Sequence, residues 1–202
     1  MSQTVHIIDD DVSLREGLDS LFRSVGLKTR TYGSAQAFLE DHDDTPGCLV
    51  LDVRLPGLSG LDFQARMTAL GVALPVVLMT GHGDIPMSVQ AMKAGAVDFL
   101  AKPFRDQDML DAVAAALARD AERREGAVGI EALREAFATL SPREQAVMTL
   151  VTSGLMNKQV AGHLDLSEIT VKIHRGAAMR KMGARTFAEL IRMADALGLK
   201  RP

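Results

Sequence analysis

Three carboxylates end short apolar segments of this sequence and could together bind a cation. Asp9 and Asp10 follow residues 5–8, and Asp52 follows residues 48–51. Crowded carboxylates repel one another and lose hydration, so proteins tolerate them mainly around a positive charge. A site made of oxygen atoms suits Mg²⁺, which takes few carboxylates and keeps several waters. Taken singly, each of these residues could instead cap a loop or a helix.

A hydroxyl and an ammonium group follow two later apolar segments. Thr80 comes directly after residues 76–79, and Lys102 comes soon after residues 97–100. Together with a metal ion, these groups would cradle a phosphoryl group on Asp52.

The apolar segments predict the elements that must position these side chains. A short apolar run bounded by turn residues is typical of a strand buried on both faces, and residues 28–32 are polar enough for an edge strand. Helical spacing separates the strands. Alternating strands and helices predict an α/β fold, a doubly wound five-stranded parallel sheet. The carboxyl ends of parallel strands share one edge of the sheet, so the three carboxylates, the hydroxyl and the ammonium group should meet there.

Four motifs in this order resemble the receiver domain of two-component response regulators. They occupy residues 7–10, 51–57, 79–83 and 102–104, and the resemblance covers about residues 4–120. It implies a flavodoxin-like receiver in which Asp52 accepts a phosphoryl group from a sensor histidine kinase. Asp10, Asp52 and the backbone carbonyl of Arg54 would bind Mg²⁺ directly, and Asp9 would act through water.

The resemblance also implies roles for the residues beyond the metal. Thr80 and Lys102 would hold phosphoryl oxygens, and Phe99 would move with Thr80, although Phe99 could also be an ordinary core residue. The bond before Pro103 is expected to be cis. His82 lies two residues after Thr80, and we expect it to tune access to the pocket rather than bind metal.

Charge divides the chain into an acidic front and a basic back. Residues 137–202 hold ten basic and five acidic residues, whereas residues 1–136 hold thirteen basic and twenty-one acidic ones. A charged segment at 119–125 is followed by Gly126 and Gly129, which predicts a fraying helix and a linker. We therefore expect a receiver domain at 1–121, a linker at 122–136 and a small all-α domain at 137–202.

Capping residues mark the helices of the second domain. Ser141 and Glu144 form a predicted capping box, as do Thr186 and Glu189. Asn157 is expected to cap a short helix, and Ser167 to cap a longer one that ends before Gly183. Two short helices joined by a tight turn fit a helix-turn-helix.

The helix predicted at 168–182 carries five basic or imidazole side chains and one acid. Such a helix suits the major groove of DNA, although a basic helix face can also be only a solvated surface. The motifs at 140–144, 157–161 and 167–175 resemble the LuxR-type DNA-binding domain over about residues 137–200. With the receiver, this resembles a response regulator of the FixJ/NarL class.

That second resemblance implies a set of DNA contacts. Lys172, Ile173, Arg175 and Gly176 would lie along the groove. Lys158, Thr170 and Lys181 would contact the backbone. Because Gly176 has no side chain, fewer base contacts would be available at its position.

Composition limits where the protein works. Cys48 is the single cysteine, which fits a reducing cytoplasm and excludes a disulfide framework within the chain. No apolar run is long enough for a membrane helix, and the N-terminal residues do not have the pattern of a secretory signal.

We therefore expect a phosphorylation-activated transcriptional regulator with double-stranded promoter DNA, a sensor histidine kinase and RNA polymerase as partners. Phosphorylation would promote a homodimer, and the protein would not be an enzyme beyond slow autodephosphorylation. One rival is a Mg²⁺-dependent phosphatase, but such enzymes usually need an acid at the position of Arg54. The other is an adaptor whose basic tail folds only against partners.

Overall fold

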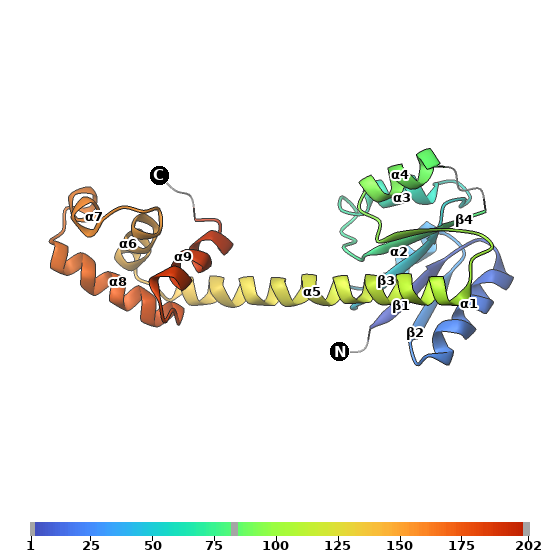
Figure 1. The fold of residues 1–202 in the computed structure, drawn as a ribbon, viewed down its shortest axis with the longest axis horizontal. Helices are drawn as coiled ribbons and strands as arrows, with labels where there is room; N and C mark the ends of the chain where they lie inside the picture. Colours follow the sequence, from blue (N-terminus) through green and yellow to red (C-terminus); the bar gives the residue numbers. More distant parts are fainter. Residues whose placement is uncertain (1–2, 82–84, 200–202) are drawn as a thin grey trace. The chain divides into compact units, whose positions relative to one another are not determined.

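Five short strands form a parallel sheet in the first part of the chain (Figure 1). In the computed structural model, which describes residues 3–81 and 85–199, they are β1 (Thr4–Ile8), β2 (Lys28–Tyr32), β3 (Gly47–Asp52), β4 (Val76–Thr80) and β5 (Asp98–Ala101). The strand order is β2-β1-β3-β4-β5, and every neighbouring pair is parallel. The predicted fold is confirmed, with β2 at one edge and β3 in the centre.

Helices cover both faces of this sheet because the buried strands are apolar on both sides. One face packs on α1 (Val12–Ser24) and the first part of α5 (Asp106–Ala138), through a core that includes Phe22 and Met109. The other packs on α2 (Ala35–Asp41), α3 (Gly60–Arg66) and α4 (Ile85–Lys93), with Phe38 and Phe63 fully buried. Residues of β3 alternate between the two cores, as the period of a strand requires.

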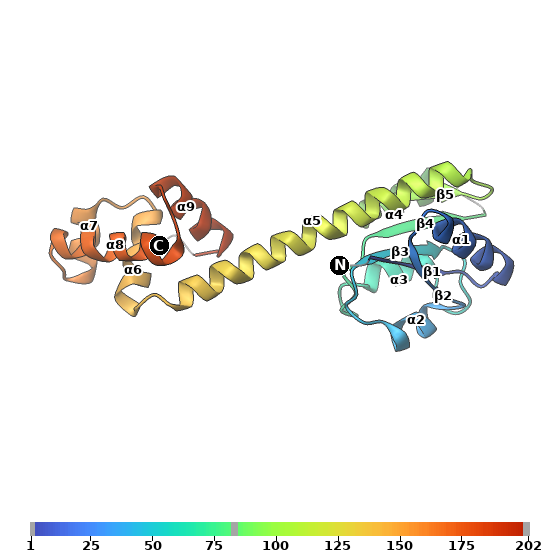
Figure 2. The ribbon, with the colours of Figure 1, turned by 90° about the horizontal axis from the view of Figure 1, so that it is seen from below.

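Helix α5 differs from its prediction. The expected helix end and linker are replaced by one helix that continues to Ala138 through Gly126 and Gly129 (Figure 2). Each glycine costs a helix about 1 kcal/mol relative to alanine, and the Ala, Glu, Arg and Leu residues around them favour the helix. The boundary between the two compact units, residues 1–123 and 124–202, lies inside this helix.

The second unit is built from short helices. They are α6 (Pro142–Thr152), α7 (Asn157–Leu164), α8 (Glu168–Met182) and α9 (Phe187–Ala196). Both predicted capping boxes are present, one from Ser141 and Glu144 and the other from Thr186 and Glu189.

The cap predicted for α7 is wrong. Met156 is the N-cap residue, and Asn157 is already helical. The side chain of Gln159 accepts the backbone N–H of Met156 at 2.8 Å, and so satisfies this helix start without a capping side chain at position 157.

Helices α7 and α8 form the predicted helix-turn-helix. The turn needs a left-handed residue, and Asp165 supplies it at φ 54°. Val160 and Val171, one from each helix, are fully buried in the same core. Gly183 ends α8 at φ 72°, where a side chain would be strained. Among the described helices, none is both long and apolar enough to cross a membrane.

A buried carboxylate ties the start of β3 to helix α5. Asp120 is fully buried, and its side chain accepts the backbone N–H of Gly47 at 2.9 Å. Arg123 donates to the same carboxylate at 2.7 Å. The strand that carries Asp52 at its far end is thereby fixed to the helix that leads into the second unit.

We expect Asp120→Ala to lower the free energy of unfolding of the first unit by about 1–3 kcal/mol, because the Gly47 N–H would lose its acceptor in a buried place. Urea unfolding followed by the fluorescence of Tyr32, the single tyrosine of the chain, measures this loss in a chain without tryptophan. Asp111→Ala, at an exposed position of the same helix, is the control and should change stability by less than about 0.5 kcal/mol. An equal loss of stability in both variants would contradict a stabilising role for the hydrogen bond between Asp120 and Gly47.

Candidate functional site

Three carboxylates meet at the carboxyl edge of the sheet, where the strand order reverses between β1 and β3. Oxygen atoms of Asp9, Asp10 and Asp52 all lie within 4.8 Å of one another. Asp9 and Asp52 are buried, whereas Asp10 is exposed. Each follows or ends a strand, so the sheet alone brings together residues more than forty positions apart.

Lys102 reaches into this acidic pocket from the loop after β5. Its Nζ lies 2.7 Å from Asp9 Oδ2 and 3.2 Å from Asp52 Oδ1. Burial alone would lower the pKa of Lys102, but the hydrogen bond and charge of Asp9, together with the charge of Asp52, raise it. One ammonium group therefore pairs with two of the three carboxylates.

The pKa of Asp52 is raised. Burial is the largest cause, and Lys102 opposes it, while the negative charges of Asp9 and Asp10 add to the rise. The ionised form of Asp52 is thus held in the fold at a cost in free energy.

The other residues expected in the pocket lie on β4, on β5 and in the loops after β3 and β5. Thr80 ends β4 and is fully buried, and its backbone oxygen accepts the N–H of Lys102 at 2.7 Å. Phe99 lies on β5, half-buried against the core cluster beneath α3 and α4. Arg54 is exposed in the loop after β3, and the bond before Pro103 is cis as expected. His82 lies outside the described residues.

Gly60 holds the loop that carries Arg54 against the end of β3. Its backbone N–H donates to the oxygen of Val53 at 2.9 Å. A Cβ atom added at Gly60 would lie 2.2 Å from the backbone oxygen of Asp52, a distance that no real contact allows. A glycine is therefore required against the backbone carbonyl of Asp52.

Helix α8 of the second unit presents the residues expected to meet DNA. Ser167 caps its start, and the hydroxyl groups of Ser167 and Thr170 lie 2.8 Å apart. Lys172 and Ile173 are exposed, and Lys158 is exposed on α7. Val171 is fully buried on the opposite side of α8, so the helix has one face in the core and one toward solvent.

Known protein families match both units. The response regulator receiver domain matches residues 5–114, and the luxR family of bacterial regulatory proteins matches residues 138–194. Nodulation protein W of Bradyrhizobium diazoefficiens is 59% identical over 196 residues, which cover 96% of this chain and 86% of that protein. The chain belongs to the FixJ-type response regulators.

Two solved structures of such regulators resemble this one. Response regulator StyR matches with a TM-score of 0.79 at 46% identity, covering 96% of this chain and 99% of that one. Full-length FixJ from B. japonicum matches with a TM-score of 0.58 at 37% identity, covering 99% and 100%. This response regulator therefore combines a receiver domain with a luxR-type DNA-binding domain, an architecture that is typically not a catalytic enzyme.

The acidic pocket of this response regulator fits a divalent cation, and receiver domains typically use Mg²⁺ there. Its donors are all carboxylate oxygens, which Mg²⁺ prefers. Three carboxylates face the single ammonium group of Lys102 among the described pocket residues, so negative charge remains to be neutralised.

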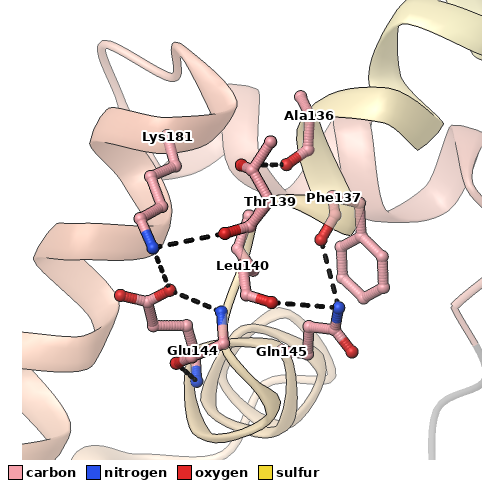
Figure 3. Close-up of polar contacts among 8 residues, drawn as sticks. Ala136, Phe137, Thr139, Leu140, Glu144, Gln145 and Lys181 are labelled. Atoms are coloured by element: carbon pink, nitrogen blue, oxygen red, sulfur yellow. Dashed lines mark hydrogen bonds and ion pairs between the residues drawn. The ribbon is translucent and has the colours of Figure 1, made fainter.

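Two residues expected at the DNA have partners inside the second unit. Lys181 donates to Glu144 Oε2 at 2.7 Å and to the backbone oxygen of Thr139 at 3.3 Å, as Figure 3 shows. The guanidinium of Arg175 lies over the ring of Phe187, 4.2 Å from its centre. Their DNA contacts stay predictions, and each would have to be made alongside or instead of these internal contacts.

The contact between Arg15 and Asp9 was not predicted from the sequence. The guanidinium of Arg15 donates a hydrogen bond to the backbone oxygen of Asp9, while the N–H of Asp11 donates to Asp9 Oδ1 at 2.9 Å. Both bonds fix Asp9 at the mouth of α1. Only the position of Arg15 in the first turns of that helix could have indicated this contact, and many arginines occupy such a position without making one.

We expect Asp52→Asn to raise the thermal midpoint of the metal-free protein by a few degrees at pH 7, because it removes a charge whose pKa is raised by burial and by Asp9. Above the raised pKa of Asp52 the side chain is ionised, and the fold bears the full free-energy cost of that charge. The cost is lost as pH falls toward about 4, the ordinary pKa of an aspartate. The gain over wild type should therefore shrink on acidification. Thermal unfolding in EDTA, from pH 7 down to about 4, measures the difference in midpoint between Asp52→Asn and wild type. Glu16→Gln, at an exposed position, is the control. A variant less stable than wild type at pH 7 would contradict the charge argument.

Proposed function

We propose that Asp52 accepts a phosphoryl group from a phosphohistidine on a sensor histidine kinase, and that this modification promotes dimerisation and promoter binding. The observation that carries the proposal is the meeting of Asp9, Asp10 and Asp52 with Lys102. A cluster of three carboxylates, two of them buried, around a single ammonium group carries excess negative charge, which favours the arrival of a metal-bound phosphoryl group.

The transfer itself needs one bond to form and one to break. A carboxylate oxygen of Asp52 attacks the phosphorus, and the bond from phosphorus to the histidine nitrogen breaks, with the electron pair left on the imidazole. The Nζ atom of Lys102 lies 3.2 Å from Asp52 Oδ1, so its positive charge would stabilise the oxygens of the transferred phosphoryl group. The Thr80 hydroxyl would hold another phosphoryl oxygen, and Phe99 would move with it.

Magnesium would neutralise the phosphoryl oxygens in this pocket. Asp10, Asp52 and the backbone carbonyl of Arg54 are its proposed direct ligands, and Asp9 is proposed to act through water. The acidic donor set supports this assignment.

Turnover is proposed to be limited to slow autodephosphorylation. A phosphatase with an aspartate nucleophile would need a general acid two residues later, and the residue there, Arg54, is not a carboxylic acid and cannot serve. The chain is thus proposed to hold the phosphoryl group as a signal.

The signal is proposed to end at DNA. Phosphorylation shifts an existing equilibrium toward a homodimer, in which two α8 helices bind half-sites about one helical turn apart. The proposed DNA contacts are those expected from the sequence: Lys158, Thr170, Lys172, Ile173, Arg175, Gly176 and Lys181. RNA polymerase is the proposed further partner, and the cytoplasm, where the chromosome lies, is the proposed location.

Binding of the full chain to duplexes recovered from its genomic binding profile tests the switch. Acetyl phosphate with Mg²⁺ should strengthen wild-type binding by roughly 5–150-fold, the usual range of coupling between two sites. Asp52→Asn should bind as unphosphorylated wild type does, with or without the phosphodonor. Glu16→Gln, an exposed change on α1, is the matched control and should respond as wild type. A full response in Asp52→Asn would show that another residue carries the switch.

A further inference from the structure

Two isoleucines lie exposed one turn apart at the start of helix α8. Ile169 is 72% exposed and Ile173 is 63% exposed. Val171 between them is fully buried, so the isoleucines lie on the solvent face and the valine in the core. Both are large and branched at Cβ, a class that helices do not favour and that usually lies inside a protein. Two such side chains side by side on the solvent face indicate a partner surface.

The surroundings of the pair indicate which partner. Three exposed residues of the same helix are cationic, namely Lys172, Arg180 and Lys181, and Lys181 also pairs with Glu144. The one exposed acid of the helix, Glu168, lies in its first turn. The next position on the stripe is Gly176, where an added Cβ would meet only the guanidinium of Arg180, at 3.7 Å. Arg180 therefore lies back along the helix toward Ile173, over a position without a side chain. An apolar stripe flanked by cations fits a polyanion that also carries apolar groups.

Duplex DNA has one such group in its major groove. Thymine presents a 5-methyl group there, and each other base presents only donors and acceptors that isoleucine cannot use. The two isoleucines lie about 6 Å apart along the helix axis, close to the rise of two base pairs. Their place in the first two turns of α8 is where a recognition helix contacts base edges.

We propose that Ile169 and Ile173 determine sequence specificity by contacting the 5-methyl groups of thymines in the major groove. The proposal rests on DNA binding by the luxR-type domain. It adds Ile169 to the DNA-binding residues and assigns a ligand chemistry to both isoleucines. Arg180, lying over Gly176, supplies a positive charge beside them. At these positions an apolar contact would then distinguish the bases, and the protein would bind thymine more tightly than uracil, which has no 5-methyl group.

Replacement of thymine by deoxyuridine removes only the methyl group and tests this directly. The full chain, treated with acetyl phosphate and Mg²⁺, first selects its preferred sequence from a pool of random duplexes. That duplex is then made with deoxyuridine in place of each thymine in turn. We expect wild-type affinity to fall about 3–10-fold at one or two positions, as the loss of a buried methyl contact predicts.

Single alanine variants then assign the contact. Ile169→Ala and Ile173→Ala should each bind the thymine and deoxyuridine duplexes equally at one of those positions, while far-UV circular dichroism confirms that the helices remain. Val128→Ala, which shortens a side chain 71% exposed on α5, is the matched control and should keep the wild-type discrimination.

Three results would overturn the inference. In the first, wild-type affinity does not change when any thymine is replaced by deoxyuridine. In the second, both isoleucine variants still bind the thymine duplex more tightly than the deoxyuridine duplex, as wild type does. In the third, the variants lose the same affinity for both duplexes at every position. Each of these leaves the phosphorylation switch standing. Conversely, a different result would overturn the phosphorylation switch and leave the isoleucine contacts standing. In that result, omission of the phosphodonor changes neither the affinity for DNA nor the preference for thymine over deoxyuridine.

Discussion

The crowding of three carboxylates around one ammonium group is the constraint on which the receiver unit depends. Asp9 and Asp52 are buried where water cannot fully solvate their charges, and Lys102 is close enough to pair with both. The arrangement is stable enough to fold and still carries unneutralised charge. A doubly wound parallel sheet provides it, because each of these residues lies at the carboxyl edge and neighbouring strands hold those ends together.

Strand β3 connects this pocket with the rest of the chain. Asp52 ends the strand at the pocket, and Gly47 begins it beside Asp120 of α5. The strand between them is buried on both faces, and burial raises the pKa of the Cys48 thiol. The pocket residue Asp52 and the hydrogen bond to α5 therefore lie at opposite ends of one tightly packed strand.

Local chemistry made part of this structure predictable from sequence. Apolar runs bounded by turn residues predicted the strands, and the common edge of parallel strands predicted the meeting of Asp9, Asp10, Asp52 and Lys102. Capping boxes at Ser141 and Thr186 were found because their residues lie three positions apart. The continuous path of α5 through Gly126 was missed, since single glycines weaken a helix without ending it. Long-range partners were also missed: nothing near Lys181 in the sequence announces Glu144, which lies 37 positions away.

We propose that the buried carboxylate of Asp52, and no other pocket acid, takes the phosphoryl group, and that a divalent cation makes this possible. Mass spectrometry of peptides from the full chain, after treatment with acetyl phosphate in Mg²⁺ or in EDTA, tests it most directly. We expect one added phosphoryl group, located on Asp52 and formed only with Mg²⁺. A phosphoryl group on Asp9 or Asp10, or one on Asp52 that forms equally well in EDTA, would contradict it.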